Sequence, residues 1–285
     1  MTEAAVRFFF FVMGASVGSF LNVCVARWPL EQSVMHPRSR CPRCHAPIRW
    51  FDNVPILAWL WLRARCRNCR APIAVVYPAV ELAVALGWLG SAVAFGPTFT
   101  AVRVAVFGTV MLGIAITDAK HYVIPDGFTV FGLVFVLVTA VVSGVRAEVT
   151  PFATPWDALI GACAGAGAIA IIGWLGEVIL KKEAMGFGDV TLMAVIGGAL
   201  GPARSLLVIF LGAAVGAVVF LGVVYPVMRL RGARGESQIE LPLGARRTEL
   251  PQIPFGVFLA PAAVLALVFG QQLVDWYVQR MMGLS

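Results

Sequence analysis

Eight long apolar stretches, separated by breaks that contain glycine or proline, constrain the fold of this 285-residue chain more than any other feature. A helix needs about 20 apolar residues to cross a bilayer. The stretches lack the polar–apolar alternation of membrane-spanning strands, and a mean hydropathy of +0.86 is not that of a soluble globular protein. We therefore expect an all-α polytopic membrane protein with about eight transmembrane helices. The expected spans are residues 8–26, 79–95, 102–117, 127–145, 157–180, 189–201, 205–228 and 255–275.

The sixth stretch, 189–201, is shorter than the others. At 1.5 Å per residue it covers about 20 Å, whereas the hydrocarbon core is about 30 Å thick. It is either a half-helix or a short crossing. A crossing is favoured, because otherwise Lys181 and Lys182 would lie on the opposite face from the arginines of 229–254. A short crossing would also draw Asp189 below the membrane surface.

Basic residues gather in alternate connections between the spans. Of the 22 Lys and Arg residues, 17 fall in segments 27–78, 118–126, 181–188 and 229–254. The positive-inside rule places these connections on the cytoplasmic side and both termini on the outer side. The net charge of +7 is thus a topology signal and a source of contacts with anionic membrane lipid. We expect no nucleic-acid partner.

The polar block at 27–78 divides the chain. It separates a first transmembrane helix, within residues 1–26, from a membrane domain at 79–285 with about seven helices. We expect no internal repeat in the sequence.

Four cysteines in this block have the spacing of a metal site. Two Cys-x-x-Cys turns, CPRC and CRNC, are separated by 21 residues, and each turn can direct two thiolates at one tetrahedral zinc ion. Two disulfides or unpaired thiols are the alternatives, and a reducing cytosol disfavours disulfides. His45 is a spare candidate ligand. The expected structural zinc ligands are Cys41, Cys44, Cys66 and Cys69.

Asp118 and Asp189 are the carboxylates most indicative of function. One closes the third span and the other opens the sixth, both on the expected cytoplasmic face. Two carboxylates that share a site do not both ionise easily, so one can act as a base while the other holds a proton. This arrangement can activate water against a peptide bond.

Gly186 and Gly188 flank the approach to Asp189. Because glycine lacks a side chain, an extended substrate or a partner helix could come close to the carboxylate there. The structural alternative is that Asp189 caps its helix and that Asp118 pairs with Lys120 or Lys182. The residue chemistry alone leaves both interpretations open.

Six stretches in this order resemble the bacterial type IV prepilin peptidases, also called prepilin leader peptidase/N-methyltransferases. They are GASVGSFLNVCVARWP at 14–29, PRSRCPRCHAPIRWFDNVPILAWL at 37–60, RCRNCRAPIAVVYPAVELA at 65–83, ITDAKHYVIPDGFT at 116–129, KKEAMGFGDVTLMAVIGGALG at 181–201 and IPFGVFLAPAA at 253–263.

The resemblance implies a Gly-x-Gly-Asp aspartic protease of the bacterial inner membrane, with periplasmic termini. Such enzymes remove the basic leader of type IV prepilins or type II secretion pseudopilins after a glycine, at the cytoplasmic face. Asp118 and Asp189 then form the catalytic pair. Many members also methylate the new N-terminus with S-adenosylmethionine, and Glu81 is a methyl-transfer candidate because it matches the family.

Two positions depart from the family pattern. Lys120 replaces a common second acidic residue, and Ala64 stands where relatives often have glycine. Two non-enzymatic functions also fit parts of the sequence. A transporter would relay protons through intramembrane carboxylates, and a membrane scaffold with a zinc module would need the cysteines but not the aspartates.

Overall fold

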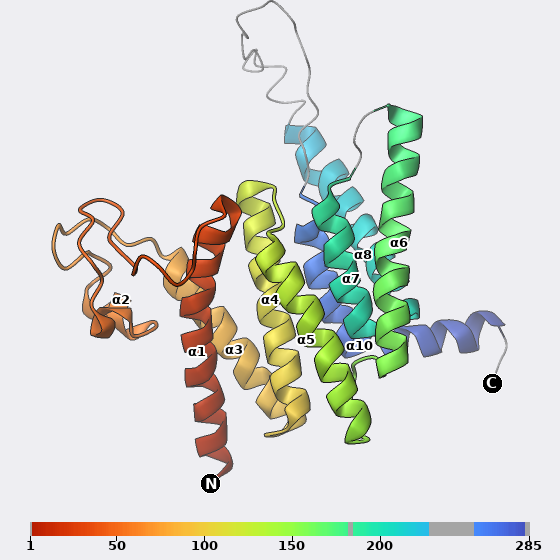
Figure 1. Cartoon of the computed structure of the whole chain (residues 1–285), viewed down its shortest axis with the longest axis horizontal. Coiled ribbons are helices and arrows are strands. Elements are labelled where there is room, and N and C mark those ends of the chain that lie inside the picture. The colour runs from red at the N-terminus through yellow and green to blue at the C-terminus, as the bar shows by residue number, and fades with distance from the viewer. Residues whose placement is uncertain (1, 182–184, 228–253, 283–285) are drawn as a thin grey trace, which may run out of the picture.

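The computed structural model describes residues 2–181, 185–227 and 254–282, which fold into a bundle of helices (Figure 1). Within these residues, seven helices are long and apolar enough to cross a membrane, and an eighth, α7 (Phe187–Leu200), is shorter. The expected all-α membrane fold is confirmed. The long helices are α1 (Glu3–Arg27), α3 (Val76–Phe95), α4 (Phe99–His121), α5 (Asp126–Val145), α6 (Pro155–Leu180), α8 (Pro202–Val219) and α10 (Gly256–Met282).

Several helices extend beyond the apolar stretches that predicted them. α1 begins at Glu3 instead of residue 8, and α4 begins at Phe99 instead of 102. In both cases a threonine side chain, Thr2 or Thr98, accepts a hydrogen bond from the first turn. A polar cap can lie outside the hydrocarbon, so the helix is longer than its hydrophobic run. The arginines expected in the 229–254 connection lie outside the described residues.

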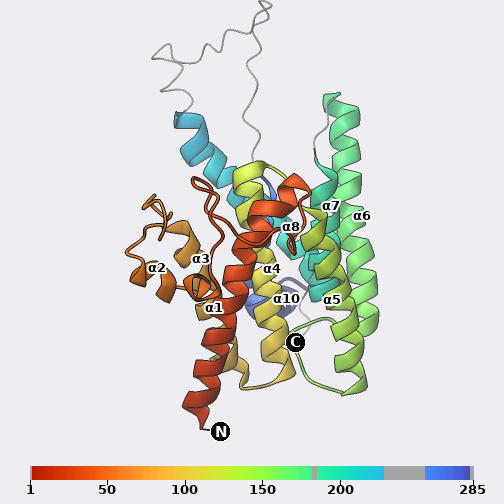
Figure 2. The same ribbon diagram turned by 60° about the vertical axis from the view of Figure 1, so that its left-hand side comes forward.

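The two ends of the bundle differ in what they hold. α1 begins and α10 ends at one end, whereas the α4–α5 connection and the end of α6 lie at the other (Figure 1). The cysteine-containing segment lies outside the bundle, beside α1 and α3, in both views (Figure 2). It contains α2 (Leu57–Trp61) and the 3₁₀ turns η1 (Trp28–Leu30) and η2 (Trp50–Asn53); a π-helical turn, η3 (Phe220–Val224), follows α8.

The short helix α7 is the most enclosed helix of the bundle. It packs against α5, α6, α8 and α10, and side chains on all its sides are fully buried, among them Leu192, Met193, Val195 and Ile196. Its 14 residues span about 21 Å. Protein rather than lipid surrounds α7, so it can be shorter than the bilayer without exposing backbone to hydrocarbon. It runs from the end where α6 finishes to the end where α8 begins, as a crossing helix does (Figure 1).

Glycines bring α6 and α7 into direct backbone contact. A Cβ atom built on Gly161 would overlap the carbonyl oxygen of Gly197, and one on Gly197 would overlap the carbonyl oxygen of Gly161. A Cβ atom on Gly165, one turn along α6, would lie 2.5 Å from the carbonyl oxygen of Met193. Small residues allow this close approach between membrane helices, where van der Waals packing replaces the hydrophobic effect as the driving force.

Two buried arginines fix the end of α7 that lies far from Asp189. Arg204 donates from Nε to the carbonyl oxygen of Leu200 at 2.8 Å and from Nη1 to that of Pro151 at 2.6 Å. The backbone N–H of Ala153 donates to Ala199 at 2.9 Å. The 146–154 connection is thereby tied to the last turn of α7.

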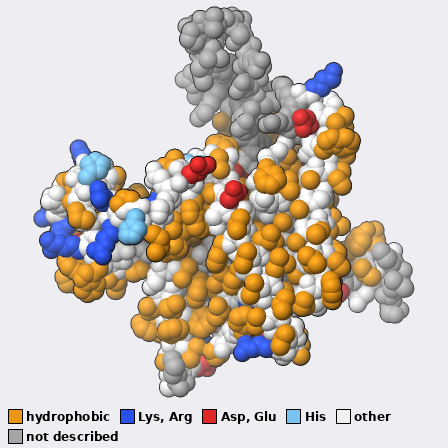
Figure 3. Space-filling model, in the orientation of Figure 1, with side chains coloured by type: hydrophobic (Ala, Val, Ile, Leu, Met, Phe, Trp, Pro, Cys, Tyr) orange, Lys and Arg blue, Asp and Glu red, His pale blue; other side chains and the backbone are white. Residues whose placement is uncertain are grey.

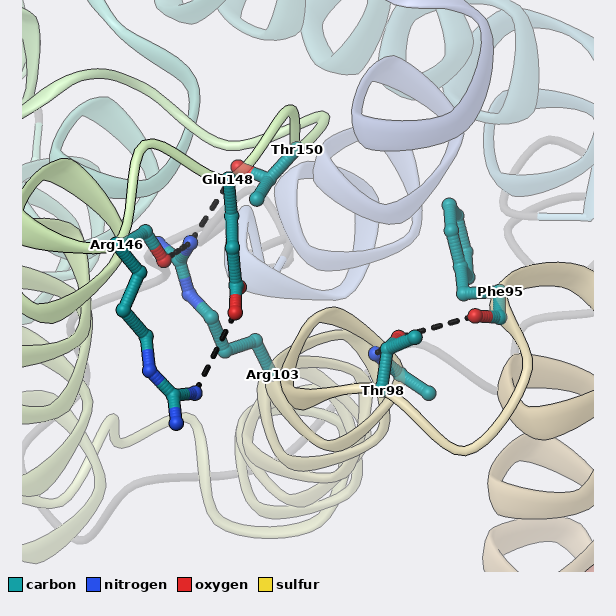
Figure 4. A network of polar contacts seen from close by, with 8 residues as sticks. Phe95, Thr98, Arg103, Arg146, Glu148 and Thr150 are labelled. Carbon is teal, nitrogen blue, oxygen red and sulfur yellow. Dashed lines mark hydrogen bonds and ion pairs between the residues drawn. The ribbon is translucent and has the colours of Figure 1, made fainter.

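Arg103 of α4 holds the same connection from its other side. Only 1% exposed, Arg103 donates to Ser143 Oγ at 2.7 Å and to Thr150 at 3.4 Å, and its guanidinium lies 4.1 Å from the centre of the Phe152 ring. Figure 4 shows Arg103 reaching Thr150 beside the Arg146–Glu148 ion pair. This end of the bundle is therefore cross-linked by polar contacts.

The glycine contact predicts a sharp difference between two substitutions on α6. Gly161→Ala should destabilise the chain by about 1–3 kcal/mol, because the added methyl group forces α6 and α7 apart. Gly167→Ala is the matched control, since a Cβ at Gly167 meets nothing within 4 Å, and it should be neutral or slightly stabilising. Thermal unfolding of both variants in nanodiscs, followed by circular dichroism, measures the effect. Equal melting temperatures would contradict this account of the interface.

Candidate active site and cysteine module

Asp118 lies in the last turn of α4 and is 5% exposed. Its Oδ2 atom accepts a hydrogen bond from the backbone N–H of Val257 at 3.1 Å, at the start of α10. The backbone of the adjacent Gly256 also lies within hydrogen-bonding reach of the carboxylate. A helix N-terminus carries free N–H groups and a partial positive charge. The first turn of α10 therefore holds the Asp118 carboxylate in place by hydrogen bonding.

Asp189 lies in the first turn of α7, and it is partly buried. Its carboxylate is close enough to Asp118 for the charge of one to act on the other. The structure thus brings together the two aspartates that the sequence singled out. α4 and α7 both pack against α5 and α10, so these two helices set the separation of the carboxylates.

The capping alternative for Asp189 is partly correct. Gly186 is the N-cap of α7, and the Asp189 carboxylate lies next to the Gly186 backbone. The Asp189 carboxylate therefore lies against the start of its own helix, as the capping alternative expects. Among the described residues Asp118 has no ion pair within 4 Å. Lys182 lies outside the described residues.

The two glycines before Asp189 have different surroundings. A Cβ on Gly188 would lie 2.9 Å from Cβ of Ile124, so its missing side chain makes room for the α4–α5 connection. A Cβ on Gly186 would meet only Asp189 Oδ2, at 3.9 Å, and the Gly188 nitrogen, at 4.0 Å. As far as the described residues show, open space therefore adjoins Gly186 but not Gly188.

Sequence reasoning missed Gly256 as a site residue. A Cβ there would lie 2.8 Å from Asp118 Oδ2 and 3.1 Å from Ile124 Cδ1. Only glycine lets the backbone N–H groups of α10 approach the carboxylate this closely. The resembling stretch at 253–263 contained this residue, but nothing local in it indicated a contact with Asp118.

The cysteine module contains a short internal repeat, so the expectation of no repeat is wrong at this scale. Residues 40–48 read RCPRCHAPI and residues 65–73 read RCRNCRAPI. Each copy forms one isolated bridge, Arg40–Pro47 and Arg65–Pro72. His45 and Arg70 occupy equivalent places with φ of 57° and 58°. His45 is thus a turn residue, and the metal-ligand cluster does not include it.

The four cysteines converge on one point. Their sulfur atoms all lie within 4.8 Å of one another, and Cys41 Sγ and Cys69 Sγ are 3.8 Å apart. Four thiolates bound tetrahedrally at about 2.3 Å from one ion are separated by about 3.8 Å. None of these cysteines forms a disulfide. The cluster therefore has the dimensions of a metal site.

Hydrogen bonds favour the thiolate form of two of the four cysteines, Cys44 and Cys66. The backbone of Ala46 and the side chain of Asn68 lower the pKa of Cys44 to about 6, and Asn68 Nδ2 lies 3.6 Å from Cys44 Sγ. Backbone contacts with Cys69 and Asn68 also lower the pKa of Cys66. The thiolate is the form that binds metals, so these two cysteines are prepared for binding. For Cys69, a hydrogen bond with the Ala71 backbone is outweighed by desolvation and by the neighbouring thiols, which raise its pKa to about 11.

Glu81 connects the module to the membrane helices. Buried in α3, it accepts a hydrogen bond from the backbone N–H of Ile56 at 2.7 Å. Ile56 has φ of 63° and is the central residue of a γ-turn closed from Leu57 N–H to the Pro55 carbonyl at 2.6 Å. This turn is strained for a β-branched residue, and Glu81 helps to hold it.

Ala64 adopts a backbone conformation that suits glycine. Its φ of 56° lies in the left-handed region, which glycine enters without steric cost and alanine does not. Alanine at this position, where relatives often have glycine, therefore costs conformational energy.

Comparison with known proteins covers nearly the whole chain. Residues 12–95 match the bacterial peptidase A24 N-terminal domain, and residues 105–221 match the type IV leader peptidase family. No solved structure matches this chain.

Several curated relatives carry the name prepilin leader peptidase/N-methyltransferase. The protein from Myxococcus xanthus is 39% identical over 83% of this chain and 68% of its own length. The protein from Aeromonas hydrophila is 31% identical, and that from Pseudomonas aeruginosa 33% identical, each over 94% of this chain and 92% of its own length.

The cysteine geometry predicts a stably bound metal ion. The purified chain should contain one equivalent of metal, and Cys44→Ser should lose most of it, because three thiolates leave the tetrahedral site incomplete. Cys163→Ser should keep the metal, since Cys163 belongs to α6 and not to the cluster. Inductively coupled plasma mass spectrometry measures the content. An unchanged metal content in Cys44→Ser would refute the site.

Proposed function

The chain belongs to the type IV leader peptidase family, and on that premise we propose that Asp118 and Asp189 hydrolyse the leader of a type IV prepilin or pseudopilin. The observation that carries the proposal is the placement of two carboxylates, from α4 and α7, at one end of the bundle. Ile124 lies against both Gly188, directly before Asp189, and Gly256, which adjoins Asp118, and the Asp118 carboxylate accepts a hydrogen bond from the N-terminus of α10. Such a pair can divide the roles of base and acid between its members.

The surroundings suggest which aspartate is the base. Asp118 accepts a hydrogen bond from Val257 N–H at 3.1 Å, and donors of this kind favour the ionised form of a carboxylate. No hydrogen bond to the Asp189 side chain has comparable geometry within the described residues. We therefore assign the base to Asp118 and the proton to Asp189.

The hydrolysis then proceeds in two steps. Asp118 takes a proton from a water molecule while the water oxygen attacks the peptide carbonyl carbon, and the carbonyl oxygen takes the proton of Asp189. In the second step the C–N bond breaks. The leaving amine takes the proton from Asp118, and the new acid returns a proton to Asp189.

The open space beside Gly186 offers room for the scissile peptide. Among the described residues no side chain occupies it, and the neighbouring Phe187 is 76% exposed. In this proposal Gly186 provides clearance for the substrate backbone, whereas Gly188 provides clearance for Ile124.

The orientation in the membrane follows from charge. The chain is a multi-pass inner-membrane protein of its family. We place the carboxylates and the cysteine module on the cytoplasmic side and both termini in the periplasm, because the connections at that end carry most of the basic residues. The carboxylates lie at one end of the bundle, which does not favour a proton-relay transporter.

The second activity of the family is methylation of the new N-terminus. We propose zinc as the metal and S-adenosylmethionine as the methyl donor. Zinc held by Cys41, Cys44, Cys66 and Cys69 would have a structural role, because four protein ligands leave no open position. Glu81 would then support methyl transfer indirectly, since its carboxylate is already bonded to Ile56 N–H.

Replacing either aspartate should remove peptidase activity. Asp118→Asn or Asp189→Asn should slow leader removal by at least about 100-fold, because each variant lacks one proton-transfer group. Mass spectrometry of the N-terminus of a co-expressed prepilin measures the result. Asp126→Asn is the control, since Asp126 is exposed at the start of α5, and it should cleave normally. Full cleavage by both active-site variants would refute the proposal.

Gly256→Ala should also impair cleavage, although it removes no reactive group. The new methyl group would displace Asp118 or α10, and a shift of about 1 Å can cost about 100-fold in rate. The turnover number should fall more than substrate binding weakens. Gly90→Ala, which meets nothing within 4 Å, is the matched control. Wild-type turnover in Gly256→Ala would exclude a positioning role for this residue.

A further inference from the structure

α2 exposes an apolar face that a water-soluble module would bury. Leu57, Leu60 and Trp61 are 64%, 58% and 84% exposed. Their spacing places them on one side of the helix, while Ala58 is buried and Trp59 donates from Nε1 to Ile73 at 3.1 Å on the other side. Within the described residues the Trp61 indole makes no hydrogen bond. The inner face of α2 packs on the module, so its outer face needs another partner.

The contact with Glu81 fixes the level of α2 relative to the membrane helices. Glu81 lies five residues beyond Val76, the first residue of α3, which is about 7.5 Å along the helix. Its carboxylate bonds to Ile56, directly before α2. α2 therefore begins beside the second turn of a membrane-spanning helix. α2 thus lies beside a helix that is apolar enough to span a membrane, where its exposed face can meet the boundary between headgroups and acyl chains.

The module also has the polarity of a membrane-surface element. Figure 3 shows hydrophobic side chains on the lower side of the module, where α2 lies in Figure 1, and basic side chains over its outer and upper parts. Arg63 and Arg65, just after α2, are exposed. Tryptophan beside apolar residues, with arginines nearby, is typical of segments in contact with anionic lipid headgroups.

We propose that α2 is an interfacial anchor, with Leu57, Leu60 and Trp61 in contact with the lipid of the bilayer. We assign lipid and not the substrate to this face, because α2 begins beside α3, a helix that is apolar enough to span the membrane. The anchor limits the tilt of the cysteine module relative to α1 and α3. The inference depends on the membrane spans and not on the peptidase assignment.

Site-specific photocrosslinking of the full chain tests this proposal. Trp61→p-benzoylphenylalanine is compared with the same replacement of Arg43, an exposed residue of the first cysteine turn. Both proteins are reconstituted in nanodiscs that contain phosphatidylethanolamine and phosphatidylglycerol, irradiated and analysed by mass spectrometry. Position 61 should form at least about tenfold more lipid adduct than position 43, because only an interfacial residue meets acyl chains.

Metal content serves as the folding control, and Leu60 provides a second position on the same face if the first variant loses its metal. Equal lipid labelling at positions 61 and 43 would overturn the proposal. Crosslinking to a co-reconstituted prepilin in place of lipid would also overturn it, and would assign the α2 face to the substrate. Neither result would affect the assignment of Asp118 and Asp189.

Discussion

The backbone contact between α6 and α7 is the constraint on which the rest of this structure depends. Gly161 and Gly197 let the two helices approach until their backbones touch, and this contact encloses α7 in protein. An enclosed helix can be shorter than the bilayer without exposing its backbone to hydrocarbon. Asp189 lies in the first turn of this short helix. The position of a catalytic candidate is thus a consequence of packing between small residues far from it.

The two ends of the bundle divide stability and chemistry between them. Arg103 and Arg204 tie the 146–154 connection to α4, α5 and the last turn of α7 through hydrogen bonds in buried surroundings. Buried arginines that bond to backbone and hydroxyl oxygens hold their elements in one arrangement. The opposite end carries the two carboxylates, the N-terminus of α10 and the open space beside Gly186. The end far from the carboxylates is thus held in place, whereas the end that carries them has space in which a peptide can bind.

The cysteine module is attached to the membrane helices through a small number of defined contacts. Two copies of one turn supply two sulfurs each, so a metal ion bound there would join the two halves of the module. Glu81 bonds to the strained turn before α2, and Asn22 of α1 donates to the Tyr77 carbonyl at 3.1 Å. These contacts set the module at the level of the first turns of α3, where its exposed apolar face meets the surface of the bilayer.

The sequence by itself determined the membrane class, the approximate spans, the four-cysteine cluster and the choice of Asp118 and Asp189, because hydropathy, ligand spacing and scarce charges are local signals. It did not reveal why 189–201 can be short, which depends on the neighbours of α7. Nor did it reveal Gly256, because Val257 lies 139 residues from the carboxylate to which it donates. Only the tertiary structure decided that a third helix, α10, seats Asp118, since no periodicity within one segment encodes a contact between segments so far apart.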